Sequence, residues 1–302
     1  RNRFGNINTI HTLKGGGFLY YYVVFWSNYV FSGYTIVVES TGGDGYKELV
    51  KKGESAFGVK ILAFLGRYIF TYVIKKADHI IYASEHLKTE IPNNTSINYV
   101  RNAYYDQRIF HPIDEQQKNI LKDKYNMPKD KIIFLTIGMV NKLKNQLYIS
   151  KVLNEIEYND WVWLVVGTSN DISEYISETR STVGEDKIKY INQWSDSPYE
   201  YYQLSDIYLF ASLREGNNNS VNEALMCGLP IILLDNGCYS HLKEFRNKCP
   251  YAVNIVKDNE EFSKNIDLLV SYEINHTLIH SLASDIYNKD NYYKIYHESL
   301  MI

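Results

Sequence analysis

Cysteine is scarce in this chain, and the cysteines that occur are not arranged in pairs. Cys227, Cys238 and Cys249 show no Cys-x-x-Cys spacing, and the eight histidines are scattered along the sequence. An odd and sparse set of cysteines is typical of a reducing compartment, and it argues against a disulfide framework or a zinc site. We therefore expect no metal site and no cofactor.

Basic residues are not in excess, and glycine and proline are few. The net charge of −3 argues against nucleic acid as a partner. With 17 glycines and 6 prolines in 302 residues, a low-complexity or fibrous protein is excluded. The chain opens at Arg1, without an initiator methionine or a signal peptide, so we expect a cropped or processed chain.

Long uninterrupted apolar runs are also missing. Residues 18–38 are uncharged, but Ser27, Asn28 and Gly33 interrupt them, which favours a buried helix and a strand over a membrane span. Residues 57–76 are expected to form a helix that is apolar on nearly all sides. We expect this segment to pack on a sheet, with a helix on a membrane surface as the alternative. A cytoplasmic location is expected, with the inner face of a membrane left open.

What is present is an alternation of short apolar strands and helices, which predicts parallel, doubly wound α/β sheets. The C-terminal segment 260–302 is expected to be helical throughout. Strands are predicted at 8–13, 34–38, 78–84, 97–100, 131–138, 161–167, 187–191, 206–210, 231–234 and 251–255, and helices at 116–125, from 146, at 170–183, at 199–204 and after 218.

The stretch 206–230 combines a buried strand, a polar loop and a short helix. Asn219 or Ser220 can cap this helix, Glu223 follows three residues after Ser220, and Gly228 with Pro230 ends it. A loop that leads from a parallel strand into a helix N-terminus directs free N–H groups at a ligand. The stretch is therefore a candidate phosphate site.

Two acids, Glu215 and Glu223, bracket that loop. If both carboxylates face one pocket, with backbone amides between them, the pocket suits a nucleotide sugar, with phosphate on the amides and hydroxyls on the carboxylates. The alternative is a capping box formed by Ser220 and Glu223, with Glu215 as a surface acid.

The same stretch resembles the signature of the retaining nucleotide-sugar glycosyltransferases of family 4, also called group 1. Glu215, seven residues, Glu223, Ala224 and the run from Gly228 to Pro230 follow the family's order. The block from residue 77 to 112 is similar to the family as well. The resemblance implies two doubly wound Rossmann-like domains facing a cleft, the GT-B fold, with the first one shortened.

The resemblance also implies a division of the chain. Residues 1–112 would form an incomplete N-terminal acceptor-side domain, 113–284 the C-terminal nucleotide-sugar-binding domain, and 285–302 a helix that crosses back to the first domain. Several opening elements of the first domain are expected to be absent, either because the chain is cropped, because another polypeptide supplies them, or because the domain is small.

On the donor side, the resemblance assigns Glu215 and Lys144 as catalytic. Family members usually carry Arg at the position of Met139 here, so a cation is missing, and Asn141, Lys142 or Arg214 could compensate. The donor-binding residues implied are Gly138, Asn141, Gly216, Asn217, Asn218, Asn219, Ser220 and Glu223. Weaker candidates for holding the base are Gly167, Gln193 and Trp194.

The acceptor side is less complete. Thr41 stands where many family members have His, and His11 and Gly16 are further candidates. The resemblance implies a retaining hexosyltransferase that uses a UDP- or GDP-sugar and a saccharide or lipid-linked acceptor in polysaccharide or glycoconjugate synthesis, without a metal, with peripheral membrane contact open and without nucleic acid. Alternatives are a non-catalytic glycosyltransferase-like binding subunit and a GT-B epimerase.

Overall fold

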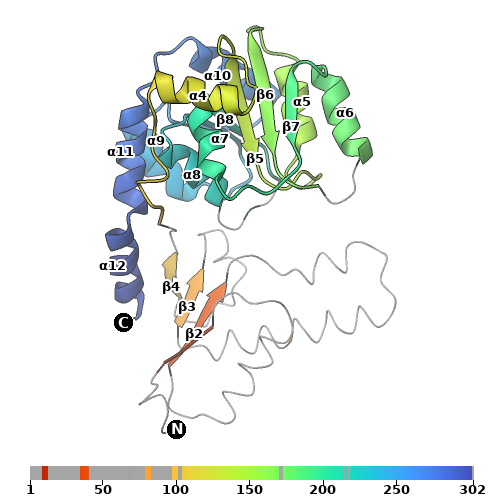
Figure 1. Cartoon of the computed structure of the whole chain (residues 1–302). Coiled ribbons are helices and arrows are strands. Elements are labelled where there is room, and N and C mark those ends of the chain that lie inside the picture. The colour runs from red at the N-terminus through yellow and green to blue at the C-terminus, as the bar shows by residue number, and fades with distance from the viewer. Residues whose placement is uncertain are drawn as a thin grey trace. The chain divides into compact units, whose positions relative to one another are not determined.

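The computed structural model describes residues 9–12, 35–40, 68, 79–82, 97–100, 104–169, 173–213, 215 and 218–300 (Figure 1). The chain divides into two compact units. Unit 1 comprises Arg1–Asn102 and Tyr292–Ile302, and unit 2 comprises Ala103–Asn291.

Unit 1 contains a four-stranded parallel sheet. Its strands lie in the order β1 (Thr9–Thr12), β2 (Thr35–Ser40), β3 (His79–Tyr82) and β4 (Ile97–Val100). The four strands predicted from the sequence in this unit are therefore confirmed. The predictions for residues 18–33, for the segment 57–76 apart from the helical Tyr68, and for Thr41 lie outside the described residues.

Unit 2 is built on a six-stranded parallel sheet whose strand order reverses in the middle. The chain builds outwards through β5, β6 and β7, and then returns to the other side of β5 with β8, β9 and β10. Doubly wound sheets bind ligands outside the carboxyl ends of the strands where the order reverses, which is between β5 and β8 here. The strands are β5 (Ile132–Ile137), β6 (Trp161–Val166), β7 (Ile188–Ile191), β8 (Ile207–Phe210), β9 (Ile231–Leu234) and β10 (Val253–Val256).

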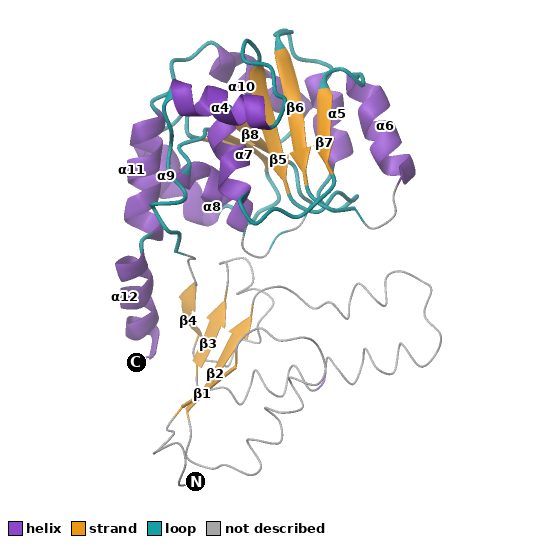
Figure 2. Cartoon of the chain, in the orientation of Figure 1, coloured by secondary structure: helices purple, strands orange, loops and turns teal. Residues whose placement is uncertain are grey.

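Helices cover both faces of this sheet, so unit 2 has three layers (Figure 2). The doubly wound α/β fold expected from the sequence is confirmed for this unit. One face carries α4 (Glu115–Lys124), α7 (Pro198–Leu204), α8 (Asn219–Met226), α9 (Lys243–Lys248) and α11 (His276–Tyr287), and the other carries α5 (Gln146–Leu153), α6 (Ser173–Val183) and α10 (Asn259–Val270).

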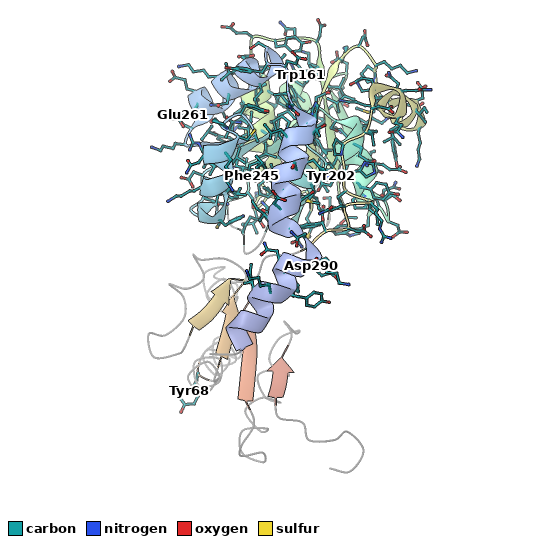
Figure 3. The ribbon with its side chains drawn as sticks, turned by 90° about the vertical axis from the view of Figure 1, so that its left-hand side faces the viewer. Tyr68, Trp161, Tyr202, Phe245, Glu261 and Asp290 are labelled. Atoms are coloured by element: carbon teal, nitrogen blue, oxygen red, sulfur yellow. The ribbon has the colours of Figure 1, made fainter. Side chains whose placement is uncertain are left out.

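The strands of unit 2 supply a core on each face because their side chains alternate. Ile133 and Leu135 pack toward α7 and α8, whereas Phe134 packs toward α5 and α10. Every residue of β6 is buried, as expected for a central parallel strand. Figure 3 labels Trp161 and Tyr202 among the closely packed side chains of this unit.

The C-terminal segment is not one continuous helical stretch, so that detail of the prediction is wrong. It forms α10, α11 and α12 (Lys289–Leu300), with residues 271–275 and Asn288 between them. Asn275 caps α11 through its side chain, and Asn288 is extended and interrupts the helix. The 3-10 turn Ser240–Leu242 and helix α9 were not predicted. Within the described parts of the chain, no helix is both long and apolar enough to cross a membrane.

Helix α11 is attached to the end of α8 by two histidines. Nδ1 of His276 lies 2.9 Å from the carbonyl oxygen of Gly228, and Nδ1 of His280 lies 2.5 Å from that of Met226. Met226 is the last residue of α8 and Gly228 follows just after its C-cap, where carbonyl groups lack N–H partners within the helix. The two histidines thus have a packing role between α8 and α11.

Candidate functional site

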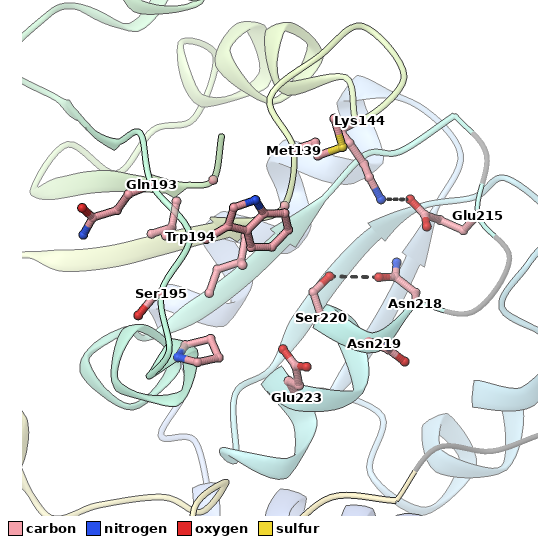
Figure 4. A pocket seen from close by; sticks show the side chains of 15 residues that line it. Met139, Lys144, Gln193, Trp194, Ser195, Glu215, Asn218, Asn219, Ser220 and Glu223 are labelled. Atoms are coloured by element: carbon pink, nitrogen blue, oxygen red, sulfur yellow. Dashed lines mark hydrogen bonds and ion pairs between the residues drawn. The ribbon is translucent and has the colours of Figure 1, made fainter. Parts of the chain in front are cut away.

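A pocket of about 430 Å³ lies at the carboxyl ends of β5, β6, β7 and β8, at the reversal of strand order (Figure 4). Loops after these strands, the start of α7 and the first turn of α8 form its walls. The described residues that line it are Ile137, Gly138, Met139, Lys144, Val166, Gly167, Gln193, Trp194, Ser195, Pro198, Glu215, Asn218, Asn219, Ser220 and Glu223.

Lys144 and Glu215 form an ion pair inside the pocket, with Nζ 2.5 Å from Oε1 (Figure 4). The two side chains are 23% and 10% exposed, so Glu215 is not the surface acid considered as the alternative. Lys144 Nζ also lies 5.3 Å from the centre of the Phe210 ring. The pair places an ammonium and a carboxylate side by side in a partly desolvated setting, where charges act more strongly than in water.

Hydrogen bonds between loops hold this pair in place. The N–H of Leu213 donates to the carbonyl of Leu143 over 2.9 Å, which joins the loop after β8 to the loop after β5. The loop after β9 supports the same region: Asn236 Nδ2 donates to the carbonyl of Ser212 over 2.8 Å, and Sγ of Cys238 lies 3.3 Å from the carbonyl oxygen of Glu215. Neither Asn236 nor Cys238 was predicted from the sequence to support the site.

Two glycines let the backbones of β5 and β6 approach closely at the floor of the pocket. Gly138 has φ +145° and Gly167 has φ +150°. A Cβ on Gly167 would lie 1.9 Å from the carbonyl oxygen of Gly138, so no other residue fits without a backbone shift. Both glycines were proposed from the sequence, and both line the pocket.

The first turn of α8 faces the pocket, but its cap differs from the prediction. Asn218 occupies the N-cap position and makes no side-chain capping bond, whereas Asn219 and Ser220 already belong to the helix. The expectation that Asn219 or Ser220 caps α8 is therefore wrong. The N–H groups of the first turn stay available to a ligand, which makes the helix start a potential anion site.

Glu223 lies in the pocket one turn further along α8. Its Oε2 accepts a hydrogen bond from the hydroxyl of Tyr202 over 2.8 Å, so the proposed capping box with Ser220 does not form. Burial raises the pKa of Glu223 to about 7, although the Tyr202 hydrogen bond lowers it. Burial also raises the pKa of Tyr202, which keeps its hydroxyl protonated as a donor.

The rim of the pocket carries an exposed aromatic ring. Trp194 is 71% exposed and comes from the loop after β7, together with Gln193 and Ser195. In Figure 4 the indole lies across the pocket from Ser220 and Glu223. An exposed indole at a pocket mouth offers a flat face on which a nucleobase can stack. Ser195 and Pro198 were missed as lining residues.

The remaining candidates are distributed as follows. Asn141 does not line the pocket; its Oδ1 accepts the N–H of Lys144 over 2.9 Å and so shapes the loop. Lys142 is exposed and is not a lining residue. Of His11 only the backbone, in β1, is described. Gly16, Thr41, Arg214, Gly216 and Asn217 lie outside the described residues.

The charges around the pocket are nearly balanced. Its described lining contains one lysine and two glutamates, while Met139 places a thioether where a cation would assist an anionic ligand. Among the described residues, those of the pocket included, no group of three or more His, Cys, Asp or Glu side chains could hold a metal ion. The charged donor that an anion would meet among these residues is therefore Lys144, beside the N–H groups at the start of α8.

Comparison with known proteins gives a consistent family. The family model for glycosyl transferases group 1 matches residues 117–282, more than half of the chain and nearly all of unit 2. An uncharacterized glycosyltransferase of Methanocaldococcus jannaschii is 24% identical over 186 residues, 58% of this chain and 43% of that protein. One of Haemophilus influenzae is 25% identical over 218 residues, 71% of this chain and 57% of that protein. The chain thus spans about half the length of these relatives.

The fold is shared with solved glycosyltransferase structures of the GT-B type. A structure of the Anabaena protein HepE in complex with UDP and glucose matches with a TM-score of 0.74 at 12% identity, over 97% of this chain and 77% of that one. At this level of identity the match concerns the fold, and it agrees with the parallel α/β architecture described above.

Proposed function

The chain belongs to the glycosyl transferases group 1 family, and on this premise we propose that it transfers a hexose from a UDP- or GDP-sugar to a saccharide or lipid-linked acceptor, with retention at the anomeric carbon. The observation that carries the proposal is the convergence of the Lys144–Glu215 pair, the uncapped start of α8 and Glu223 on one pocket. Such transfers serve polysaccharide or glycoconjugate synthesis.

In this proposal, Lys144 and the start of α8 bind the diphosphate. When the bond between the anomeric carbon and the β-phosphate oxygen breaks, the electron pair stays on that oxygen. The oxygen of the acceptor hydroxyl takes its place on the sugar, and the hydroxyl proton passes to the leaving phosphate oxygen. Lys144 and the N–H groups of Asn219 and Ser220 would stabilise the charge on the leaving group. Glu215, beside Lys144, would accept hydrogen bonds from sugar hydroxyls and face the electron-poor anomeric carbon.

Glu223 and Trp194 would hold the nucleoside. A carboxylate accepts hydrogen bonds from two neighbouring hydroxyls, which suits Glu223 to the ribose. Trp194 would stack on the base, with Gly167 and Gln193 beside it. The complexes of the Anabaena protein with UDP and with UDP-glucose favour a uridine nucleotide as the first donor to test.

The proposal requires no divalent metal, because the described donors around the diphosphate are a lysine and N–H groups. Activity that survives treatment with EDTA would support this, and activity restored only by added Mg²⁺ or Mn²⁺ would contradict it. We place the reaction in the cytoplasm, at the inner face of a membrane if the acceptor is lipid-linked.

One observation favours a second candidate function, a glycosyltransferase-like subunit that binds the donor without turnover. Met139 leaves Lys144 as the one cation among the described lining residues, and Lys144 is already paired with Glu215. A site of this kind could bind a nucleotide yet stabilise the leaving group too weakly for fast transfer. Product analysis separates the two candidates, because both bind the donor and only the first consumes it.

The test is a donor screen on the full chain, by thermal shift with UDP, GDP and their sugars, followed by product analysis. We expect a nucleotide to raise Tm and its sugar to be consumed. Lys144→Met should lower the transfer rate roughly 100-fold or more. Lys151→Met, which removes an exposed lysine of α5, is the matched control. If no nucleotide raises Tm, or if Lys144→Met retains full activity, the proposal is wrong.

A further inference from the structure

A buried donor in the pocket wall has no partner of its own. Asn218 is only 5% exposed, and its Nδ2 makes no hydrogen bond with the described residues. In Figure 4 this nitrogen lies on the side of the Lys144–Glu215 pair. A buried N–H group without a partner is costly and rare in native proteins. The geometry therefore leaves this donor for a bound ligand.

The orientation of the Asn218 amide is set by a chain of hydroxyls that starts in the core. The hydroxyl of Tyr208 donates to Oγ of Ser220 over 2.8 Å, and Ser220 donates to Oδ1 of Asn218 over 2.9 Å. The other acceptor near Tyr208, the carbonyl of Ile137, is farther away at 3.3 Å. Because each hydroxyl has one proton, donation from Tyr208 leaves the Ser220 proton for Oδ1, and Nδ2 is turned toward the pocket.

The direction of these hydrogen bonds, from Tyr208 through Ser220 to Asn218, suits an anionic ligand rather than a cationic one. If it ran the opposite way, Asn218 would present Oδ1 to the pocket, and a negatively charged ligand would be repelled. In the direction described, Nδ2 joins Lys144 Nζ and the N–H groups of the uncapped first turn of α8. All of these groups are donors, so a ligand atom that meets them has to be an acceptor, and a phosphate oxygen accepts several hydrogen bonds at once.

We propose that Tyr208, acting through Ser220, positions the side-chain amide of Asn218 to donate a hydrogen bond to a phosphate oxygen of the bound nucleotide. The inference rests on the proposed function for the identity of that nucleotide. Asn218 and Ser220 line the pocket, whereas Tyr208 is fully buried in β8 and is a positioning residue.

Tyr208→Phe is the decisive variant, because it removes the hydroxyl and keeps the ring. The ring stacks on Phe210 with a centroid distance of 6.1 Å, and that contact is retained. We expect the Kd for UDP, measured by calorimetry on the full chain, to rise roughly five-fold, the usual effect of one lost hydrogen bond. Tyr125→Phe is the matched control, because it deletes the hydroxyl bonded to Glu200, and neither residue lines the pocket.

A double-mutant cycle separates positioning from general destabilisation. Asn218→Ala should raise the Kd at least as much as Tyr208→Phe, and adding Tyr208→Phe to it should cause no further rise, because the hydroxyl then has no amide to orient. Independent, additive effects would overturn the proposal. So would an unchanged Kd in Tyr208→Phe, whatever happens to its Tm.

Inorganic pyrophosphate, titrated into the same variants, distinguishes this inference from the proposed function. If the wild-type chain binds UDP and the variants bind it equally well, the inference fails and the proposed function stands. If UDP and GDP do not bind, but pyrophosphate binds with an affinity that depends on Tyr208 and Asn218, the inference stands and the proposed function fails. If pyrophosphate and nucleotides both fail to bind, both are wrong.

Discussion

The clearest quantitative prediction concerns Glu223, whose carboxyl group is buried in the pocket wall. Its pKa rises from 4.5 to about 7, and burial is the main cause. At 1.36 kcal/mol per unit, ionising this group in the folded protein costs about 3 kcal/mol of stability. A raised pKa means that the folded state holds the proton more tightly. The stability that protonated Glu223 retains, about 3 kcal/mol relative to the ionised group, is therefore fully present below pH 4.5 and is lost as the pH rises through 7.

Glu223→Gln removes this titration. The glutamine Oε1 can still accept the hydroxyl of Tyr202, and any cost of burying the amide is independent of pH. We expect the unfolding free energy of the variant, minus that of the wild type, to increase by about 3 kcal/mol between pH 4.5 and pH 8. Guanidinium unfolding followed by tryptophan fluorescence measures it, because Trp161, Trp163 and Trp194 all lie in unit 2.

Glu200→Gln is the matched control, since Glu200 also accepts a tyrosine hydroxyl, from Tyr125 over 2.5 Å. Burial alone would raise the pKa of Glu200, but hydrogen bonds from Lys124 and Tyr125 lower it. The stability that Glu200 contributes is then present above its unfolded pKa and lost as the pH falls. The unfolding free energy of Glu200→Gln, minus that of the wild type, should therefore decrease as the pH rises. If the unfolding free energy of Glu223→Gln, minus that of the wild type, does not change between pH 4.5 and pH 8, burial does not raise the pKa of Glu223 as described.

Three further predictions follow from the same pocket. If ionised Glu223 binds the ribose, the Kd for UDP should rise roughly ten-fold from pH 8 to pH 6, and calorimetry should show no such trend in Glu223→Gln. Met139→Arg should strengthen UDP binding roughly ten-fold by adding a cation at the diphosphate, and unchanged or weaker binding would count against that placement. Gly167→Ala should lower Tm strongly, because its Cβ would lie 1.9 Å from the Gly138 oxygen, whereas Gly237→Ala, also at positive φ but with open space around it, should lower Tm only slightly.

The strands were the most predictable part of the fold. The run 161–167 was expected as a strand, and the structure forms β6 over Trp161–Val166 with every residue buried. Short apolar runs bounded by polar turns carry that information locally. The breaks in the C-terminal helices were not predictable in the same way. Asn288 is extended, and no proline or glycine nearby signals the interruption.

The cap of α8 shows why local patterns fail at the site. Asn218, Asn219 and Ser220 are all good N-cap residues, so the sequence alone cannot choose among them. In the structure the hydroxyl of Ser220 is bonded instead to Tyr208, which lies in the strand before the loop. The partner of Glu223 was not predictable locally either, because Tyr202 belongs to α7 whereas Glu223 belongs to α8. The motif located the acids, and tertiary contacts determine their protonation and partners.

The Lys144–Glu215 pair also bears on which ligand the pocket would prefer. Lys144 and Glu215 are paired at 2.5 Å, so in the proposed function a diphosphate would compete with Glu215 for the ammonium group of Lys144. Leaving the carboxylate buried and unpaired would be costly, unless the sugar hydroxyls of the same donor supply its hydrogen bonds. A nucleotide sugar can satisfy both residues at once, whereas a nucleotide without sugar satisfies only Lys144. If the proposed function holds, the ion pair would favour the complete donor over the nucleotide product, and the product would be released more readily after transfer.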